Sequence, residues 1–377
     1  MNSSVDSSLA GCYVAAPVRF MVYGRGSVLK SLPDIISKLR GSKALIVTGK
    51  TLSTKTPVIK DIESLLGSTH VGTFNEIGQH APIGAIRTAT KVALDAAVDI
   101  LISVGGGSPI DSAKAMVYQI HEQTGIWIPS IAIPTTLSVA ETTQNAGFTT
   151  EEKKKIAVSH PELVPKAVIY DGDIAVYTPI KLWTSTGIRA LDHAVELLYH
   201  PLASEIPTKR LALEAVRELF TYLPLSLDNP QDADIRQKLL LACYSSLFPF
   251  LYTGGVGLSH SLGHSLGASY NIPHGITSCL TLAPVIGYKS NTNEDESKMI
   301  ARVLPYIGIV GTPSVTDNAK LVSAAIEKLV TQLGHRSTLT MYGVPAEDEE
   351  EIVSHALQGG KSHPDFDAVK SIVHKLY

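Results

Sequence analysis

The sequence has little cysteine, no long apolar run and no excess of basic residues. Its 377 residues include 3 cysteines, Cys12, Cys243 and Cys279, which lie far apart and form no CxxC pair. This usage predicts reduced thiols and not a disulfide framework. No segment approaches the roughly 18 consecutive apolar residues of a membrane-spanning helix, so no membrane span is expected.

Basic patches and targeting signals are also missing. The 32 Lys and Arg residues are balanced by 35 Asp and Glu, which leaves a net charge of −3. Proteins that bind nucleic acid or anionic membranes normally carry a basic excess, so neither partner is expected. No signal peptide or C-terminal retention signal is recognisable. We therefore expect a cytoplasmic protein that acts on a small molecule.

The chain is long enough for two domains, and its 44% of hydrophobic residues can fill two cores. Residues 1–176 alternate short apolar runs with helical patterns, which predicts an α/β domain with a parallel sheet. Strands are expected at 43–48, 70–74, 99–104, 130–133 and 167–170, an edge strand or hairpin at 18–23, and helices at 54–66, 83–97 and 111–124. Residues 177–377 predict an all-helical domain, with the active site in the cleft between the two.

A glycine-rich turn, VGGGSPID at 104–111, lies between a predicted strand and a predicted helix. Gly105, Gly106 and Gly107 permit a sharp turn and a close approach of phosphate oxygens. The N–H groups of the following helix would then face the anion. A tight turn without a ligand is the alternative, but the position at the end of a central strand favours nucleotide binding. The pattern is neither GxGxxG nor a P-loop.

Hydroxyl groups follow the next strand in the segment PTTLS at 134–138. The side chains of Thr135, Thr136 and Ser138 could bind phosphate or the nicotinamide carboxamide, or could simply cap the turn.

Four of the 13 histidines lie in apolar, glycine-rich segments of the second domain. His260 and His264 are four residues apart and share one helical face, while His193 and His274 come from separate segments. A single helical histidine is more often a buried polar residue than a ligand. Four together could form a transition-metal site.

These segments together resemble the iron-containing (group III) alcohol dehydrogenase family. The resemblance rests on GGGSPID at 105–111, PTTLS at 134–138, ALDHAVE at 190–196 and HSLGH…PHG at 260–275. It extends over essentially the whole chain and is strongest for the maleylacetate-reductase-like branch. It implies a nucleotide-binding domain, a helical catalytic domain, NAD or NADP as cofactor, and a homodimer.

The resemblance also implies roles for individual residues. Those expected at the cofactor are Gly49, Lys50, Gly105, Gly106, Gly107, Ser108, Asp111, Thr135, Thr136, Ser138 and Lys155. His193, His260 and His274 match three metal-ligand histidines, and His264 matches the histidine that helps to relay the proton.

The chain departs from the family at Arg189. Metal-dependent members carry an Asp four residues before the first histidine, which is His193 here. Asp192 is not expected to replace it, because on a helix it points about 100° away from its neighbour. The permanent charge of Arg189 opposes a divalent ion, so bound Fe or Zn is not expected. Arg189, with His260 or His274, would then act as the electrophile for the substrate. Alternatively, Arg189 would turn outward to pair with a carboxylate and leave the three histidines as a weak metal site.

Cofactor preference is predicted from the end of the strand at 43–48. Gly49 stands where the family often places an acid that binds the ribose hydroxyls, and Lys50 could attract a 2′-phosphate. NADP(H) is therefore favoured over NAD(H), although Gly49 could merely form the turn. The favoured function is hydride transfer to or from a carbonyl, an alcohol or an unsaturated keto acid. The alternatives are a lyase-type enzyme on the same fold and an inactive nucleotide-binding protein.

Overall fold

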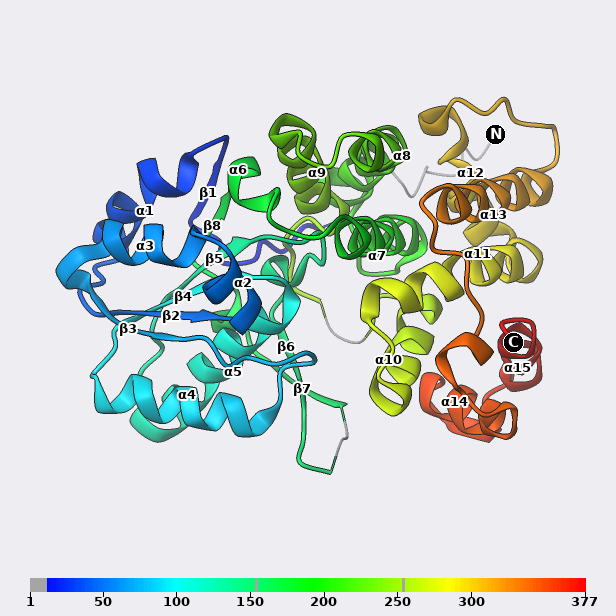
Figure 1. Cartoon of the computed structure of the whole chain (residues 1–377). Coiled ribbons are helices and arrows are strands. Elements are labelled where there is room, and N and C mark those ends of the chain that lie inside the picture. Colours follow the sequence, from blue (N-terminus) through cyan, green and yellow to red (C-terminus); the bar gives the residue numbers. More distant parts are fainter. Residues whose placement is uncertain (1–11, 153–154, 253–254) are drawn as a thin grey trace.

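The computed structural model describes residues 12–152, 155–252 and 255–377. Its first half is built on a parallel sheet, and its second half is helical (Figure 1). The six strands lie in the order β1-β8-β5-β4-β2-β3. Their bounds are β1 Phe20–Tyr23, β2 Ala44–Thr48, β3 His70–Phe74, β4 Ile100–Gly105, β5 Ser130–Pro134 and β8 Ala167–Tyr170. The predicted parallel α/β fold is confirmed, and β1 is the expected edge strand.

Helices cover both faces of the sheet because strand residues alternate in direction. Helices α1 (Ser27–Lys38) and α3 (Val58–Leu66) pack on the face that includes Ile46. Helices α4 (Ile83–Asp95) and α5 (Gly107–Thr124) pack on the opposite face, against Leu45, Val47 and Leu101. Figure 1 shows these two helical layers on either side of the strands.

The helix expected at 54–66 is in fact two helices, α2 (Lys50–Lys55) and α3. The break falls at Thr56, which has φ −134° and ψ 160°. Pro57 explains this conformation, because a proline disfavours the helical region for the residue before it.

The first half contains elements that were not predicted, and two of them are larger than the rest. One is α1, and the other is an antiparallel hairpin of β6 (Asn145–Thr149) and β7 (Lys155–Ser159). The hairpin projects from the sheet on the side of α4 and α5 (Figure 1).

The part of the chain after β8 is helical, as predicted. Its helices are α6 Gly172–Ala175, α7 Ile180–Tyr199, α8 Arg210–Asp228, α9 Ala233–Ser246, α10 Leu258–Tyr270, α11 His274–Thr292, α12 Glu294–Ala301, α13 Val315–Gln332, α14 Glu349–Ala356 and α15 Phe366–His374. None of the helices in the described ranges has the length and apolar character needed to cross a membrane.

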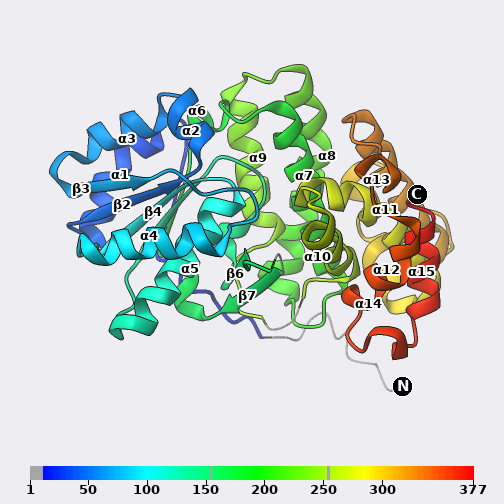
Figure 2. The ribbon, with the colours of Figure 1, turned by 60° about the horizontal axis from the view of Figure 1, so that its bottom comes forward.

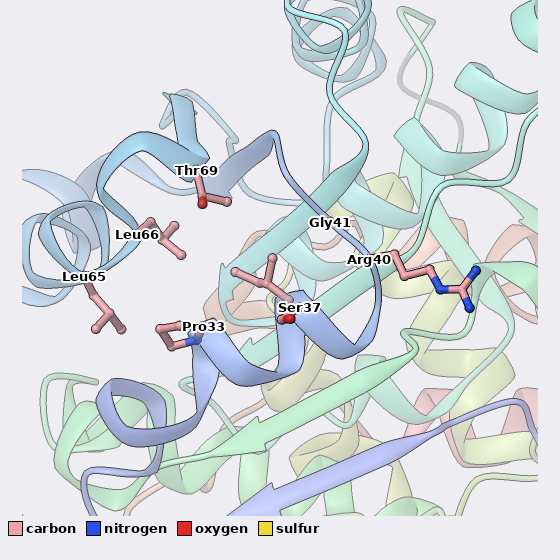
Figure 3. A pocket seen from close by; sticks show the side chains of 8 residues that line it. Pro33, Ser37, Arg40, Gly41, Leu65, Leu66 and Thr69 are labelled. Carbon is pink, nitrogen blue, oxygen red and sulfur yellow. The ribbon is translucent and has the colours of Figure 1, made fainter.

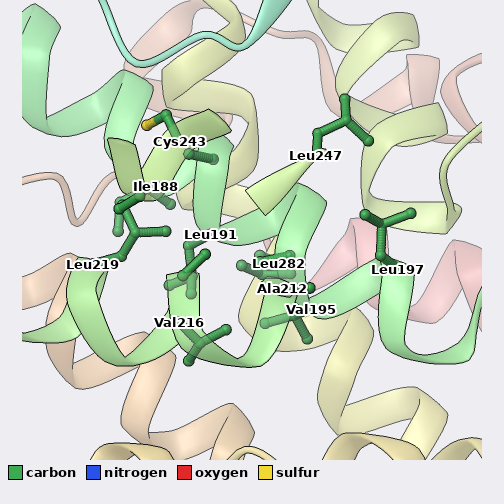
Figure 4. Packing of buried hydrophobic residues seen from close by; sticks show 14 of the residues in the cluster. Ile188, Leu191, Val195, Leu197, Ala212, Val216, Leu219, Cys243, Leu247 and Leu282 are labelled. Carbon is green, nitrogen blue, oxygen red and sulfur yellow. The ribbon is translucent and has the colours of Figure 1, made fainter. Parts of the chain in front are cut away.

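Helix α7 is the centre of the helical half. Its residues Ile188 and Leu191 pack with Leu219 of α8 and Leu282 of α11 (Figure 4). The same cluster includes Tyr170 of β8, so the sheet and the helices share a core. Both views place α7 and α10 at the boundary between the two halves (Figure 1, Figure 2). This shared packing holds α7 in a fixed position relative to the strand ends.

Candidate active site

The carboxyl ends of β2, β4 and β5 lie side by side in the sheet. From β2 the chain continues to β3, the outermost strand on one side of the sheet. From β4 it continues in the opposite direction, to β5 and then β8. The reversal lies between β2 and β4, and open α/β sheets bind ligands at such a point. The carboxyl ends of these strands therefore bring together three residues that were predicted from separate motifs, Gly49, Gly105 and Thr135.

The glycine turn has the geometry of an anion-binding helix start. Gly105 has φ +145°, a conformation that favours glycine. Helix α5 begins at Gly107, and no side chain caps its N-terminus. Its first turn includes Ser108, and its N–H groups and dipole favour a negatively charged ligand.

The glycine turn packs directly against the PTTLS loop. A Cβ at Gly106 would lie 3.0 Å from Thr136 Cγ2, and one at Gly107 would lie 3.3 Å from Ser138 Oγ. The Thr135 N–H donates to the Gly105 carbonyl at 2.9 Å. The two predicted cofactor segments therefore form one surface, on which larger side chains would collide.

A buried lysine that was not predicted, Lys114, binds the segment that follows the PTTLS loop. Lys114 Nζ donates to the Ala140 carbonyl, to Thr143 Oγ1 at 3.1 Å and to the Asn145 carbonyl at 2.9 Å. Asp111 Oδ1 lies 3.9 Å from the same nitrogen. Burial lowers the pKa of Lys114 to about 8. The sequence did contain a signal for this pair, because residues three apart on a helix lie on the same face.

The remaining cofactor predictions fall on β2 and β7. Gly49 has φ −97° and ψ 153°, which any residue adopts, and a Cβ there would lie 3.5 Å from the Ile77 carbonyl. Packing therefore does not require glycine at this position. Lys50 is exposed at the start of α2. Lys155 begins β7, and its side chain lies outside the described residues.

The PTTLS loop is tied to the helix that carries Arg189. The Leu137 N–H donates to Thr186 Oγ1 at 3.1 Å, and Thr186 lies on α7 one turn before Arg189. The candidate nicotinamide loop and the histidine-bearing helix are thereby held together.

The four predicted histidines form a row of rings. The ring centroids of His193 and His260 are 4.4 Å apart, those of His260 and His264 5.9 Å, and those of His264 and His274 5.5 Å. Burial and then the charge of Arg189 hold the pKa of His193 and of His260 well below the usual value. Both rings are therefore neutral at physiological pH.

Arg189 is 6% exposed and points into the protein. Its Nη1 donates to Ser278 Oγ at 3.1 Å and lies 3.6 Å from Asp192 Oδ2. The expectation that Arg189 turns outward is therefore wrong, although it does pair with a carboxylate. A Cβ at Gly263 would lie 3.2 Å from Nη1, so this glycine makes room for the guanidinium.

Asp192 also lies inside the cluster, which corrects the expectation that it points away. Its Oδ2 accepts hydrogen bonds from Ser278 Oγ at 2.5 Å and Ser259 Oγ at 3.1 Å. The same oxygen is 3.6 Å from His260 Nδ1. Asp192 does point about 100° away from His193 around the helix. In that direction its carboxylate meets Ser259 and His260 of α10 and Ser278 of α11.

A second buried carboxylate completes the cluster. Glu196 accepts from the N–H groups of Ser259 at 2.8 Å and His260 at 3.3 Å. Burial and the neighbouring Asp192 raise the pKa of Glu196 to about 8. Ligand atoms of Asp192, Glu196 and His260 lie within 4.8 Å of one another, a donor set that a metal ion could use. Arg189 already places a positive charge beside it.

One cavity lies away from these residues. It measures about 360 Å³ and lies where α1 and α3 end, near the amino end of β2. The glycine turn lies at the opposite, carboxyl end of the strands. Figure 3 shows Leu65 and Leu66 on one side of it and the Arg40 guanidinium directed away from them. It contains none of the predicted site residues.

Comparison with known proteins identifies the family. The model of the iron-containing alcohol dehydrogenases matches residues 19–172, and the model of the C-terminal part of that family matches residues 183–376. The chain belongs to the iron-containing alcohol dehydrogenase family. The resemblance predicted from the motifs is confirmed.

Relatives within the family narrow the assignment. A maleylacetate reductase of Rhizobium sp. (strain MTP-10005) is 30% identical over 354 residues, which covers 91% of this chain and 90% of that protein. A lactaldehyde reductase of Escherichia coli (strain K12) is 29% identical and covers 89% and 90%. The crystal structure of a maleylacetate reductase from Agrobacterium tumefaciens has a TM-score of 0.81 at 26% identity and covers 98% of both chains. This iron-containing alcohol dehydrogenase homologue is an NAD(P)-dependent oxidoreductase of the maleylacetate-reductase-like branch.

Proposed function

We propose that this enzyme transfers a hydride from NADPH, bound at the glycine turn, to a carbonyl compound or an unsaturated keto acid. The hydrogen bond from the Leu137 N–H to Thr186 Oγ1, at 3.1 Å, carries the proposal. It joins the loop expected at the nicotinamide to α7, one turn before Arg189. The keto acid is chosen because maleylacetate reductases are among the relatives.

The cofactor is bound by groups at the carboxyl ends of three neighbouring strands. The first turn of α5 takes the pyrophosphate, while Thr136 and Ser138 lie on the nicotinamide side. NADPH is favoured because Gly49 leaves no carboxylate to repel a 2′-phosphate and Lys50 is exposed beside it. The reduced nicotinamide supplies the hydride when bound.

The enzyme is proposed to work without a metal ion. In place of the family's Asp, Arg189 puts a buried guanidinium 3.6 Å from Asp192, and its positive charge opposes a divalent cation next to His193 and His260. The guanidinium supplies positive charge near the substrate oxygen on which negative charge develops, as an alkoxide or an enolate. The neutral imidazole of His260 donates a hydrogen bond to the same substrate oxygen. His264 passes the proton that completes the reduction to the substrate.

Two further predictions belong to this proposal. The enzyme is a homodimer, which sedimentation of the purified chain tests by its mass. It is also cytoplasmic, which fractionation of the source cells tests.

Activity with purified enzyme tests the proposal. NADPH oxidation is followed with maleylacetate and with lactaldehyde, and the Gly106→Asp variant is the control for the cofactor site. Oxidation by the wild type and its loss in the variant are expected. A wild type that binds NADPH but oxidises it with neither substrate would overturn the proposal.

A further inference from the structure

A fifth histidine extends the row of rings from the opposite half of the molecule. His80 lies in the loop between β3 and α4, and its ring is 5.3 Å from that of His274 at an interplanar angle of 88°. The other four histidines come from α7, α10 and α11. His80 is therefore a contribution of the nucleotide-binding half to this row of histidines.

The backbone at His80 is held in an unusual conformation. His80 has φ +62° and Ala81 has φ +51°, values that residues other than glycine seldom adopt. Thr149, at the end of β6, fixes both residues. Its Oγ1 donates to the His80 carbonyl at 3.1 Å, and its N–H donates to the Ala81 carbonyl at 3.2 Å. The hairpin thus holds the loop so that the imidazole meets His274.

His80 and His264 each contact His274, so a substrate that reaches both of them must be longer than one that contacts His264 alone. The ring of His264, the proposed proton relay, is 5.5 Å from that of His274, and the ring of His274 is in turn 5.3 Å from that of His80. A small aldehyde bound at His264 does not span two ring spacings. A substrate that contacts both ends carries a second polar group several bonds from its carbonyl. An imidazole N–H that donates to a carboxylate forms a charge-assisted hydrogen bond, stronger than one to a neutral group.

We propose that His80 binds the carboxylate of the keto acid at the end remote from the carbon that accepts the hydride, and so selects acids over neutral aldehydes. The inference rests on the proposed function, since it requires that the enzyme reduces a carbonyl compound. It assigns His80 to the substrate and not to the cofactor.

Kinetics with two substrates test the assignment. His80→Ala and His80→Asn are compared with the wild type in NADPH oxidation with maleylacetate and with lactaldehyde. Asparagine tolerates a positive φ and keeps an N–H donor. His70→Ala is the matched control, because His70 begins β3 at the far edge of the same sheet. NADPH binding, followed by fluorescence, shows that each variant is folded.

For maleylacetate we expect His80→Ala to raise KM by about tenfold or more, the loss typical of a charge-assisted hydrogen bond. His80→Asn should recover part of this loss. The kcat/KM for lactaldehyde and the kinetics of His70→Ala should stay within about twofold of the wild type. If His80→Ala does not bind NADPH, the KM of His80→Asn for maleylacetate decides, with an increase of about threefold or more supporting the proposal.

An unchanged KM for maleylacetate in His80→Ala would overturn the inference, as would an equal loss with both substrates. A wild type that reduces lactaldehyde but not maleylacetate would overturn it too, while leaving the proposed hydride transfer to a carbonyl compound intact. A wild type that oxidises NADPH with neither substrate removes the proposed function, and this inference with it.

Discussion

Loss of the Arg189 charge should destabilise the helical half of the molecule. Asp192 is fully buried, and Arg189 Nη1, at 3.6 Å, is the cation beside it. Arg189→Met keeps the apolar stem but leaves the carboxylate without its counter-charge. Breaking a buried ion pair in this way costs about 3–5 kcal/mol of unfolding free energy. The same variant should lose about 2–4 kcal/mol of transition-state stabilisation in kcat/KM.

Urea unfolding followed by tryptophan fluorescence measures the stability term. The chain has 2 tryptophans, so Trp127→Phe leaves Trp183, which is buried on α7 six residues before Arg189. In this background the double variant Arg189→Met/Asp192→Asn should recover most of the lost stability, because the charge that needed compensation is gone. Arg189→Lys should lose less than Arg189→Met.

Stability of Arg189→Met within about 1 kcal/mol of the wild type would show that the Arg189 charge does not stabilise the buried Asp192. So would strictly additive effects of the two substitutions, because residues that form an ion pair show an interaction energy in a double-mutant cycle.

Three more outcomes follow from the cofactor side. Gly106→Asp should weaken NADPH binding by at least about 100-fold, since its Cβ would lie 3.0 Å from Thr136 and its charge would face the pyrophosphate; equal titration of variant and wild type would contradict this. Gly49→Asp should shift the kcat/KM ratio towards NADH, and an unchanged ratio would remove Gly49 from the adenosine site. Lys114, with its pKa lowered to about 8, releases its proton in the folded state before the unfolded chain does. Wild-type stability relative to Lys114→Met should therefore rise by about 3 kcal/mol between pH 8 and pH 10.5, and a flat difference would contradict the shift.

The strands were predictable because a parallel sheet buries them on both faces. Residues 44–47 are all fully buried, and an apolar run of this kind leaves a signal that needs no partner to be recognised. Helix α1 gave a weaker signal, since Pro33 lies inside it and no side chain caps its start. The hairpin of β6 and β7 has short strands that include Gly147, and glycine is unfavourable in a strand interior.

The site was predictable where one motif carries its own geometry. His260 and His264 share a helical face whatever surrounds them, and Gly105 demands a turn. The partners of Arg189 were not predictable, because Ser278 comes from a helix far along the chain. His80 was missed because no motif surrounds it; its position depends on the hairpin, itself a long-range feature.

If Arg189 takes the place of the family's metal ion, the enzyme should not depend on a metal. The measurement is the rate of NADPH oxidation with maleylacetate before and after chelation, with Fe and Zn determined in the same sample. We expect far less than one metal ion per chain and a rate that chelation leaves unchanged. About one Fe or Zn per chain, with activity lost on chelation and restored by the metal, would contradict this expectation.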